Sequence, residues 1–491
     1  MDRYLTVAEV TESARRLVSR FPGTGRLRRI GTSRAGRPIL MLSVGHGPRH
    51  ALAVAGPHPD EPVGGASALA LAERVARGDR RSPATDPSVV TWDIVLCLDP
   101  DGAALSEAAG VTGDAGAIAG GIAGAGGIAG ASMTTGGIAG ADVNAGASVT
   151  TGSGAGVPAV ADAAPGTAAA PAPTLKSYYG AAYRPVAAEQ PEWAPIAAGP
   201  IPESQALFQV IDERRPFIQC SLHSTDVGGS WVQLTGDLPE LALPFAASAK
   251  ELGVPLQHGT YDALYWDNPG PGVYVLPPPD GTDRLAAGSA DIGRSTWCAP
   301  MRYGGVTAIV EVPMWAADSA EDVSPHPEPV RALRGLSALV RDGGRQVTAV
   351  LDKARGFLPP AGDDPSRRVL EWMADGLYDL VAESWEPLAR QAAAASHEND
   401  PRRPTTAQVS ALEIVARRQP LRAAGLLLRL LASADDPAAP GLRQELDGLF
   451  TAWCADFEQA LGVRWIPVRD QVEHQTRTVT AAAEAALKSS R

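Results

Sequence analysis

Residues 51–65 read ALAVAGPHPDEPVGG, an apolar run that is followed at once by His58 and Glu61. A continuous apolar run is typical of a strand that is buried in a parallel sheet. In open α/β sheets, ligands gather at the carboxyl ends of such strands. The stretch therefore predicts a strand that ends in an imidazole and a carboxylate, which is how a metal site at a strand end begins.

The elements predicted on both sides of this stretch alternate between strand and helix. Apolar residues at helical spacing predict helices near 6–20 and over 62–77. Strands are predicted over 38–44, 51–55, 92–98, 217–222, 231–234 and 306–312. The alternation is typical of an α/β domain. From about residue 325 the pattern becomes helical and predicts an all-α C-terminal region.

The length of the chain, 491 residues, favours more than one folded unit. We expect a catalytic domain over residues 1–345 and a helical region over residues 346–491. Within the first unit, residues 108–173 form a Gly/Ala-rich low-complexity insertion in which Gly-Ile-Ala-Gly recurs. Such a composition buries too little apolar surface to offset the entropy of ordering.

Composition excludes several classes of protein. The net charge is −12 and no stripe of Lys or Arg is present, which argues against nucleic acid as a partner. The four cysteines are isolated, which argues for reduced thiols and against a disulfide framework. No apolar stretch is long enough to span a membrane, and no secretion signal is recognisable at the N-terminus. We therefore expect a soluble, cytoplasmic protein.

Two later strands also carry polar residues of catalytic type. His223 follows the apolar strand 217–222, and Glu311 interrupts the apolar strand at 306–312. A catalytic zinc ion commonly takes two His and one Glu as ligands, which His58, Glu61 and His223 can supply. A buried acid is costly unless it has a function, so Glu311 is the candidate proton shuttle.

Each of these residues also has a structural interpretation. The first pair, His58 and Glu61, could cap a loop. By itself, His223 is more readily explained as a hydrogen-bonded structural histidine. A salt bridge within the strand would account for Glu311 about equally well.

Taken together, the motifs resemble those of the zinc carboxypeptidases of the carboxypeptidase A type. In chain order they are Ile30-Gly31-Thr32-Ser33-Arg34-Ala35-Gly36-Arg37-Pro38-Ile39, His58-Pro59-Asp60-Glu61, Asp99-Pro100-Asp101-Gly102, Ser221-Leu222-His223-Ser224 and Val310-Glu311-Val312-Pro313. The resemblance covers about residues 5–345 without the insertion. It implies an α/β/α sandwich around a mixed, largely parallel eight-stranded sheet.

The resemblance also implies the chemistry of the site. One zinc ion would be bound by His58, Glu61 and His223. General base and then general acid would be Glu311, in hydrolysis of a C-terminal peptide bond or a similar amide bond. The substrate would be a peptide or an N-acyl amino acid.

Two departures from the family pattern are visible. The family's Asn-Pro-Asp-Gly begins here with Asp99. The family segment Asp-x-Asn-Arg, whose arginine helps to hold the substrate carboxylate, has its nearest match at residues 142–145, where alanine replaces the arginine. The best substitute is Arg184, just after the insertion, and Arg294 and Arg302 are further candidates.

Two other functions stay open at the level of sequence. One is an N-acyl amino acid deacylase of the same fold, similar to aspartoacylase and succinylglutamate desuccinylase. The other is a catalytically silent binding module. The C-terminal helices are expected to cover the catalytic domain or to mediate self-association.

Overall fold

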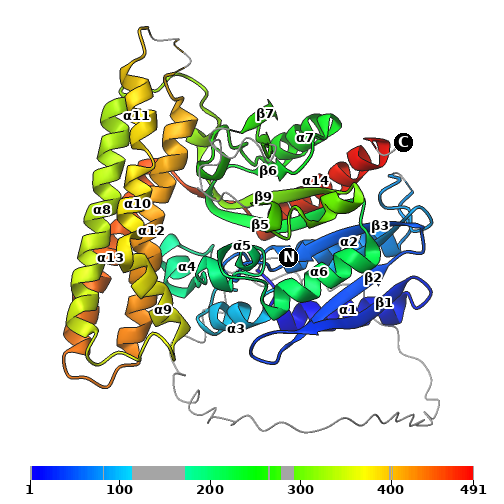
Figure 1. Ribbon diagram of the computed structural model, residues 1–491, viewed down its shortest axis with the longest axis horizontal. Helices are drawn as coiled ribbons and strands as arrows, with labels where there is room; N and C mark the ends of the chain where they lie inside the picture. Colours follow the sequence, from blue (N-terminus) through cyan, green and yellow to red (C-terminus); the bar gives the residue numbers. More distant parts are fainter. Residues whose placement is uncertain are drawn as a thin grey trace, which may run out of the picture.

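The computed structural model describes residues 3–80, 82–112, 172–263, 266–277, 292–397, 400 and 402–489. A β-sheet with helices on both faces forms one part of the molecule, and long helices stand together at one end of it (Figure 1). The expected fold class is confirmed: a mixed α/β sheet covered on both sides, with a helical C-terminal region. Most of the insertion expected over 108–173, including the segment 142–145, lies outside the described residues.

The described strands form a single sheet in the order β1-β2-β4-β3-β5-β9-β6-β8-β7, with β10 paired to β9. Their bounds are β1 (Gly25–Thr32), β2 (Pro38–Val44), β3 (Arg49–Ala55), β4 (Val90–Val95), β5 (Ile218–Gly228), β6 (Trp231–Leu234), β7 (Asp267–Gly270), β8 (Val273–Val275), β9 (Val306–Ala316) and β10 (Arg464–Trp465). The central strands β4, β3, β5 and β9 run parallel to one another, while the pairs β1–β2 and β2–β4 are antiparallel.

The sheet has ten strands in the described part of the chain, where eight were expected. Four of the ten are short: β6 and β7 have four residues each, β8 has three and β10 has two. β7 lies at the edge of the sheet, and β10 pairs with the end of β9. β10 forms because the chain passes the end of β9 on its way from the helical region to the last helix.

The α-helices of the described residues lie on the sheet or beside it (Figure 1). Their bounds are α1 (Val7–Arg20), α2 (Gly64–Ala76), α3 (Pro100–Ala108), α4 (Leu175–Ala181), α5 (Ala194–Ala197), α6 (Pro202–Arg214), α7 (Ala242–Leu252), α8 (Pro329–Ala354), α9 (Pro365–Trp372), α10 (Tyr378–Glu383), α11 (Glu386–Ala393), α12 (Thr406–Ala432), α13 (Ala439–Leu461) and α14 (Val468–Ser489).

The central strands are buried on both faces because successive side chains of a strand point to opposite sides. On β3, Leu52 and Val54 belong to an apolar cluster with Leu207 of α6. Ala53, between them, belongs to the cluster on the other face, with Leu71 of α2. Burial on both faces explains why β3 reads as an unbroken apolar run.

Helices α8 to α13 share an apolar core with α4 and form the helical region at the end of the sheet. The last helix, α14, leaves this region and packs against β9, α2 and α7. It therefore covers the sheet, although it follows the helical region in sequence. Residue 346, where we expected the second unit to begin, lies inside α8.

Two simpler expectations can be compared with the structure. The four cysteines are all free, and Cys97, Cys220 and Cys454 are buried. Among the described residues, none of the helices combines the length and the hydrophobicity that a membrane crossing requires.

Candidate metal centre and active site

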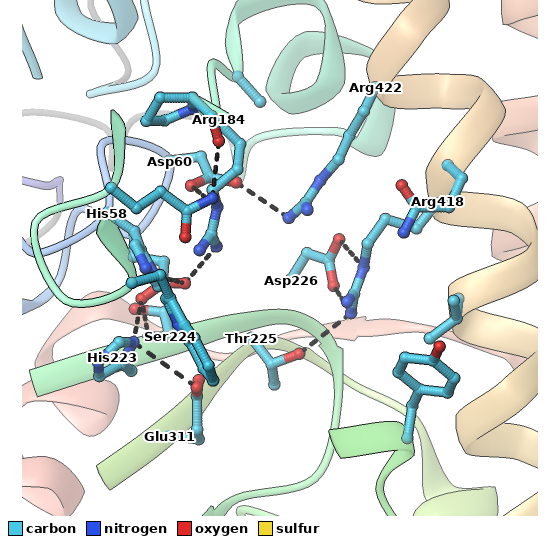
Figure 2. Close-up of a pocket in the computed structure, with 18 of the residues that line it drawn as sticks. His58, Asp60, Arg184, His223, Ser224, Thr225, Asp226, Glu311, Arg418 and Arg422 are labelled. Atoms are coloured by element: carbon cyan, nitrogen blue, oxygen red, sulfur yellow. Dashed lines mark hydrogen bonds and ion pairs between the residues drawn. The ribbon is translucent and has the colours of Figure 1, made fainter. Parts of the chain in front are cut away.

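The four residues expected to carry metal binding and catalysis converge at one edge of the sheet (Figure 2). His58 and Glu61 follow β3, while His223 lies in β5 and Glu311 in β9. In the pairing of β5 with β9, His223 stands opposite Glu311. Because β3, β5 and β9 are parallel neighbours, their carboxyl ends meet at the same edge.

The Glu61 carboxylate lies between the two imidazoles. Its Oε1 is 3.0 Å from Nδ1 of His58, and its Oε2 is 2.9 Å from Nδ1 of His223. The two imidazole rings are 4.9 Å apart between centroids. Oε1 of Glu311 lies 3.7 Å from Nδ1 of His223, on the open side of the cluster.

The residues present fit a divalent metal of the zinc type. Two sets of donor atoms lie close enough to share one ion: His58 with Glu192 and His223, and Glu61 with His223 and Glu311. Nε2 of His58 is buried and has no hydrogen-bond partner among the described residues. Imidazole nitrogens and carboxylate oxygens are common ligands of catalytic zinc.

The charges of the cluster favour a cation at this point. Burial would raise the pKa of Glu61, but the charges of Arg184, His58 and His223 outweigh it and hold this pKa well below its usual range. Burial opposes protonation of His223, yet the carboxylates of Glu61 and Glu192 raise its pKa well above the ordinary value. Burial, followed by the charge of Arg184, lowers the pKa of His58. A metal ion would take the place of the proton that the carboxylates attract to His223.

Glu192 is a member of the cluster that sequence reasoning missed. Its side chain is fully buried, and Oε2 lies 3.1 Å from Nε2 of His223. Oε1 accepts a hydrogen bond of 2.6 Å from the Ser221 hydroxyl. Glu192 thus orients the ring of His223 from behind, as carboxylates next to metal-binding histidines do. It gave no sequence signal because it is a single acid outside any strand or helix.

The last helix, α14, holds the backbone on which His223 and Glu311 lie. The side-chain amide of Gln475 donates to the carbonyl of His223 at 2.7 Å and to that of Val310 at 3.1 Å. On the same helix, His474 contacts the Ser230 hydroxyl at 2.9 Å. That hydroxyl donates to the Glu311 carbonyl at 2.7 Å. One helix therefore ties β5 to β9 at the level of the site.

Of the three candidate arginines, the structure brings Arg184 to the site. Its Nε lies 2.8 Å from Oδ1 of Asp60, and its Nη2 contacts Glu61. The side chain is 22% exposed. Arg294 and Arg302 instead line a separate, shallow pocket with Phe208.

A cavity of about 340 Å³ opens beside the cluster. All five predicted site residues line this cavity: His58, Glu61, Arg184, His223 and Glu311. Five of the chain's ten tryptophans also line it: Trp193, Trp231, Trp266, Trp297 and Trp372. The helical region supplies a further wall, with Val369 and Met373 on one side and Arg418 and Arg422 of α12 on another. Sequence reasoning did not find this wall because it depends on how the helical region packs on the sheet.

Comparison with known proteins agrees with the expected resemblance. Residues 10–118 match a family model described as zinc carboxypeptidase. This part contains His58 and Glu61, whereas Arg184, His223 and Glu311 lie beyond it. The resemblance to zinc carboxypeptidases is therefore confirmed over residues 10–118. A search of curated proteins found no match.

Solved structures similar to this chain include two bacterial metallo-carboxypeptidases. The enzyme from Burkholderia cenocepacia is 14% identical, with 62% of this chain and 59% of that chain covered and a TM-score of 0.34. The enzyme from Pseudomonas aeruginosa, in complex with (2-guanidinoethylmercapto)succinic acid, is 15% identical, with 62% and 59% covered and a TM-score of 0.31. The matched part thus spans about three fifths of the length of each.

Proposed function

We propose that the protein is a zinc-dependent hydrolase that cleaves a C-terminal peptide bond or a similar amide bond. The observation that supports this most strongly is the Glu61 carboxylate between two imidazoles, with Glu311 beside them at the edge of one cavity. The family match over residues 10–118 supports the same class of activity.

In this proposal His58, Glu61 and His223 hold the zinc ion. When bound, zinc would supply a Lewis acid that polarises the scissile carbonyl and makes water more acidic. The Glu192 carboxylate keeps His223 in the orientation that turns Nδ1 toward Glu61. The buried position of these side chains excludes bulk water from the cluster and strengthens its electrostatic interactions.

Glu311 is the proposed general base and general acid. Its side chain is 12% exposed, against 4% for Glu61 and 0% for Glu192, so it is the most accessible carboxylate of the cluster. It would take the proton of the attacking water and then transfer it to the leaving amine. A proton shuttle must reach both groups, which suits the position of Glu311 at the cavity.

The proposed role of Arg184 is to orient the substrate through its carboxylate. The guanidinium lines the cavity next to Glu61 and presents a planar fork of donors. Asp60 fixes its position from the buried side.

A second candidate activity is removal of the acyl group from an N-acyl amino acid. The cavity volume of about 340 Å³ is near the lower end for ligand sites, and residues of the helical region wall it on one side. Such a space suits a small substrate. Parallel assays with short peptides and with N-acyl amino acids separate the two activities.

The decisive experiment measures metal content and hydrolysis in the same preparations. We expect about one zinc per chain in the wild type and in Glu311→Gln, because Glu311 is not a proposed ligand. Hydrolysis should fall by about 10²–10⁴-fold in Glu311→Gln. In His58→Ala, zinc and hydrolysis should be lost together.

Two results would contradict the proposal. Full zinc content in His58→Ala would show that the ligand assignment is wrong. A zinc-loaded wild type that hydrolyses neither peptides nor N-acyl amino acids would favour the silent binding module instead.

A further inference from the structure

Helix α14 covers the sheet at β5 and β9, yet it carries polar side chains on its buried face (Figure 1). His474, Gln475 and Thr478 are all fully buried. A buried polar group is costly unless it is hydrogen-bonded, and each of the three has a partner. The partners of His474 lead to the backbone of the proposed general base, Glu311.

The site lies where the regular pairing of the central strands ends. The ladder between β3 and β5 stops at Leu222, one residue before His223. The ladder between β6 and β9 stops at Glu311. Backbone groups at such positions need other partners. The amide of Gln475 donates to the carbonyl of His223. The hydroxyl of Ser230 donates to the carbonyl of Glu311 at 2.7 Å.

The chemistry of these groups fixes the direction of the hydrogen bonds that end at Glu311. A carbonyl can only accept, so the proton of the Ser230 hydroxyl points to Glu311. The oxygen of Ser230 must then accept from Nε2 of His474, which lies 2.9 Å away. Nε2 of His474 therefore carries a proton.

The surroundings of His474 hold it in one state. Burial lowers its pKa to about 3, so the ring is neutral at neutral pH. Its single proton is on Nε2, and Nδ1 accepts from the Ser248 hydroxyl at 2.9 Å. The ring also stacks on Phe245, with 5.3 Å between centroids. A chain of hydrogen bonds thus runs in one direction, from α7 through His474 to Ser230.

We propose that His474 is a positioning residue for Glu311 and acts through the Ser230 hydroxyl. The inference rests on the proposed hydrolase function, in which Glu311 transfers the proton. His474 is not one of the described residues that line the cavity, so it acts on the reaction through the backbone of β9. A displacement of about 1 Å in a reacting group can cost about 10²-fold in rate, so a fixed backbone at Glu311 matters for turnover.

The test compares two variants that keep different halves of the imidazole. In His474→Gln, the side-chain amide lies near the position of Nε2 and can still donate to Ser230. In His474→Asn, the shorter amide can reach Ser248 but not Ser230. Both are assayed as zinc-loaded protein on an amide that the wild type cleaves.

We expect kcat of His474→Asn to fall by about 10–100-fold, because the carbonyl of Glu311 is no longer fixed. KM and zinc content should stay at the wild-type values, since neither substrate binding nor the metal ligands are changed. His474→Gln should recover most of kcat. A loss of zinc in His474→Asn would place the effect at the metal and contradict the proposal.

Thr476→Val is the matched control on the same helix. Thr476 is buried, and its hydroxyl donates to the carbonyl of Val472 within α14 at 2.7 Å. Its removal changes the helix but not the chain of hydrogen bonds to Glu311, so kcat should keep the wild-type value. An equal fall of kcat in Thr476→Val would mean general damage to α14 and would contradict the proposal.

Two further measurements apply if His474→Asn fails to fold. Ser230→Ala removes only the last hydroxyl of the chain: a fall in kcat supports the proposal, and an unchanged kcat contradicts it. In the wild type, NMR of isotopically labelled histidine at neutral pH should show His474 with its proton on Nε2. A proton on Nδ1 would contradict the direction of the chain.

The outcomes separate this inference from the proposed function. If the wild type hydrolyses an amide while His474→Asn and Ser230→Ala keep its kcat, the positioning role is wrong and the hydrolase function stands. If the zinc-loaded wild type hydrolyses no amide, the proposed function fails, and the positioning role fails with it.

Discussion

Asp99 illustrates how one residue can make stability depend on pH. The side chain caps α3 by accepting a hydrogen bond of 3.0 Å from the Gly102 amide, and it is 1% exposed. Its other oxygen, Oδ2, has no partner among the described residues. Burial raises the pKa of Asp99 to about 7. The carboxyl group is therefore largely protonated in mildly acidic solution and loses its proton as the pH rises. An asparagine in its place would be neutral at every pH.

We expect Asp99→Asn to remove a pH-dependent loss of stability. Between the usual pKa of 3.8 and about 7, the folded state binds a proton that the unfolded state has released. The free energy of unfolding therefore falls as pH rises through this window, by about 1.4 kcal/mol per pH unit. In urea unfolding, the free energy of unfolding of the variant minus that of the wild type should be about 2–3 kcal/mol larger at pH 8 than at pH 5. Parallel pH curves for the two proteins would contradict the prediction.

Glu192 should affect zinc affinity without being a proposed ligand. In Glu192→Gln the negative charge behind His223 is lost, while a similar shape and an acceptor for Ser221 remain. We expect zinc affinity, measured by competition with a chelator, to fall by about 10–100-fold. The exposed Glu213, which pairs with Arg28, provides a control as Glu213→Gln. Equal affinities in the two variants would mean that Glu192 does not support the metal.

At the scale of elements, α12 approaches the sheet side of the molecule because of a glycine. A Cβ atom on Gly425 would lie 2.0 Å from the carbonyl oxygen of Tyr179, on α4. The residue is therefore required for the close contact between α12 and α4. It lies one turn after Arg422, so this contact also sets how far the arginine reaches into the cavity.

Gly425→Ala is expected to push α12 away from α4. Because the clash is with backbone, we expect a loss of about 1–3 kcal/mol in the free energy of unfolding. Thermal unfolding measures this loss.

Gly448→Ala is the matched control within the same helical region. The glycine is exposed in the middle of α13, and an added Cβ meets no atom within 4 Å. Here alanine should stabilise the protein by about 0.5–1 kcal/mol through its better helix propensity. Destabilisation of similar size at both positions would rule out a specific role for the contact with Tyr179.

For the whole molecule, sequence reasoning predicted the position of a side chain where that position follows a local pattern. His58 and Glu61 follow a buried strand, and Glu311 interrupts one, so periodicity alone pointed to the same edge of the sheet. Glu192 and Arg422 have no such pattern. A lone acid in a loop and an arginine on a helix occur throughout the chain, and only tertiary packing brings Glu192 to His223 and Arg422 to the cavity.

The position of Gln475 has a consequence for the order in which the protein is made. The amide that bridges β5 and β9 comes 252 residues after His223 in the chain. A ribosome will have translated the whole helical region before this bridge can form. During synthesis the two imidazoles and their carboxylates thus exist on a nascent chain in which the backbone carbonyls of His223 and Val310 still lack the Gln475 amide. The centre is completed only once α14 has emerged and docked.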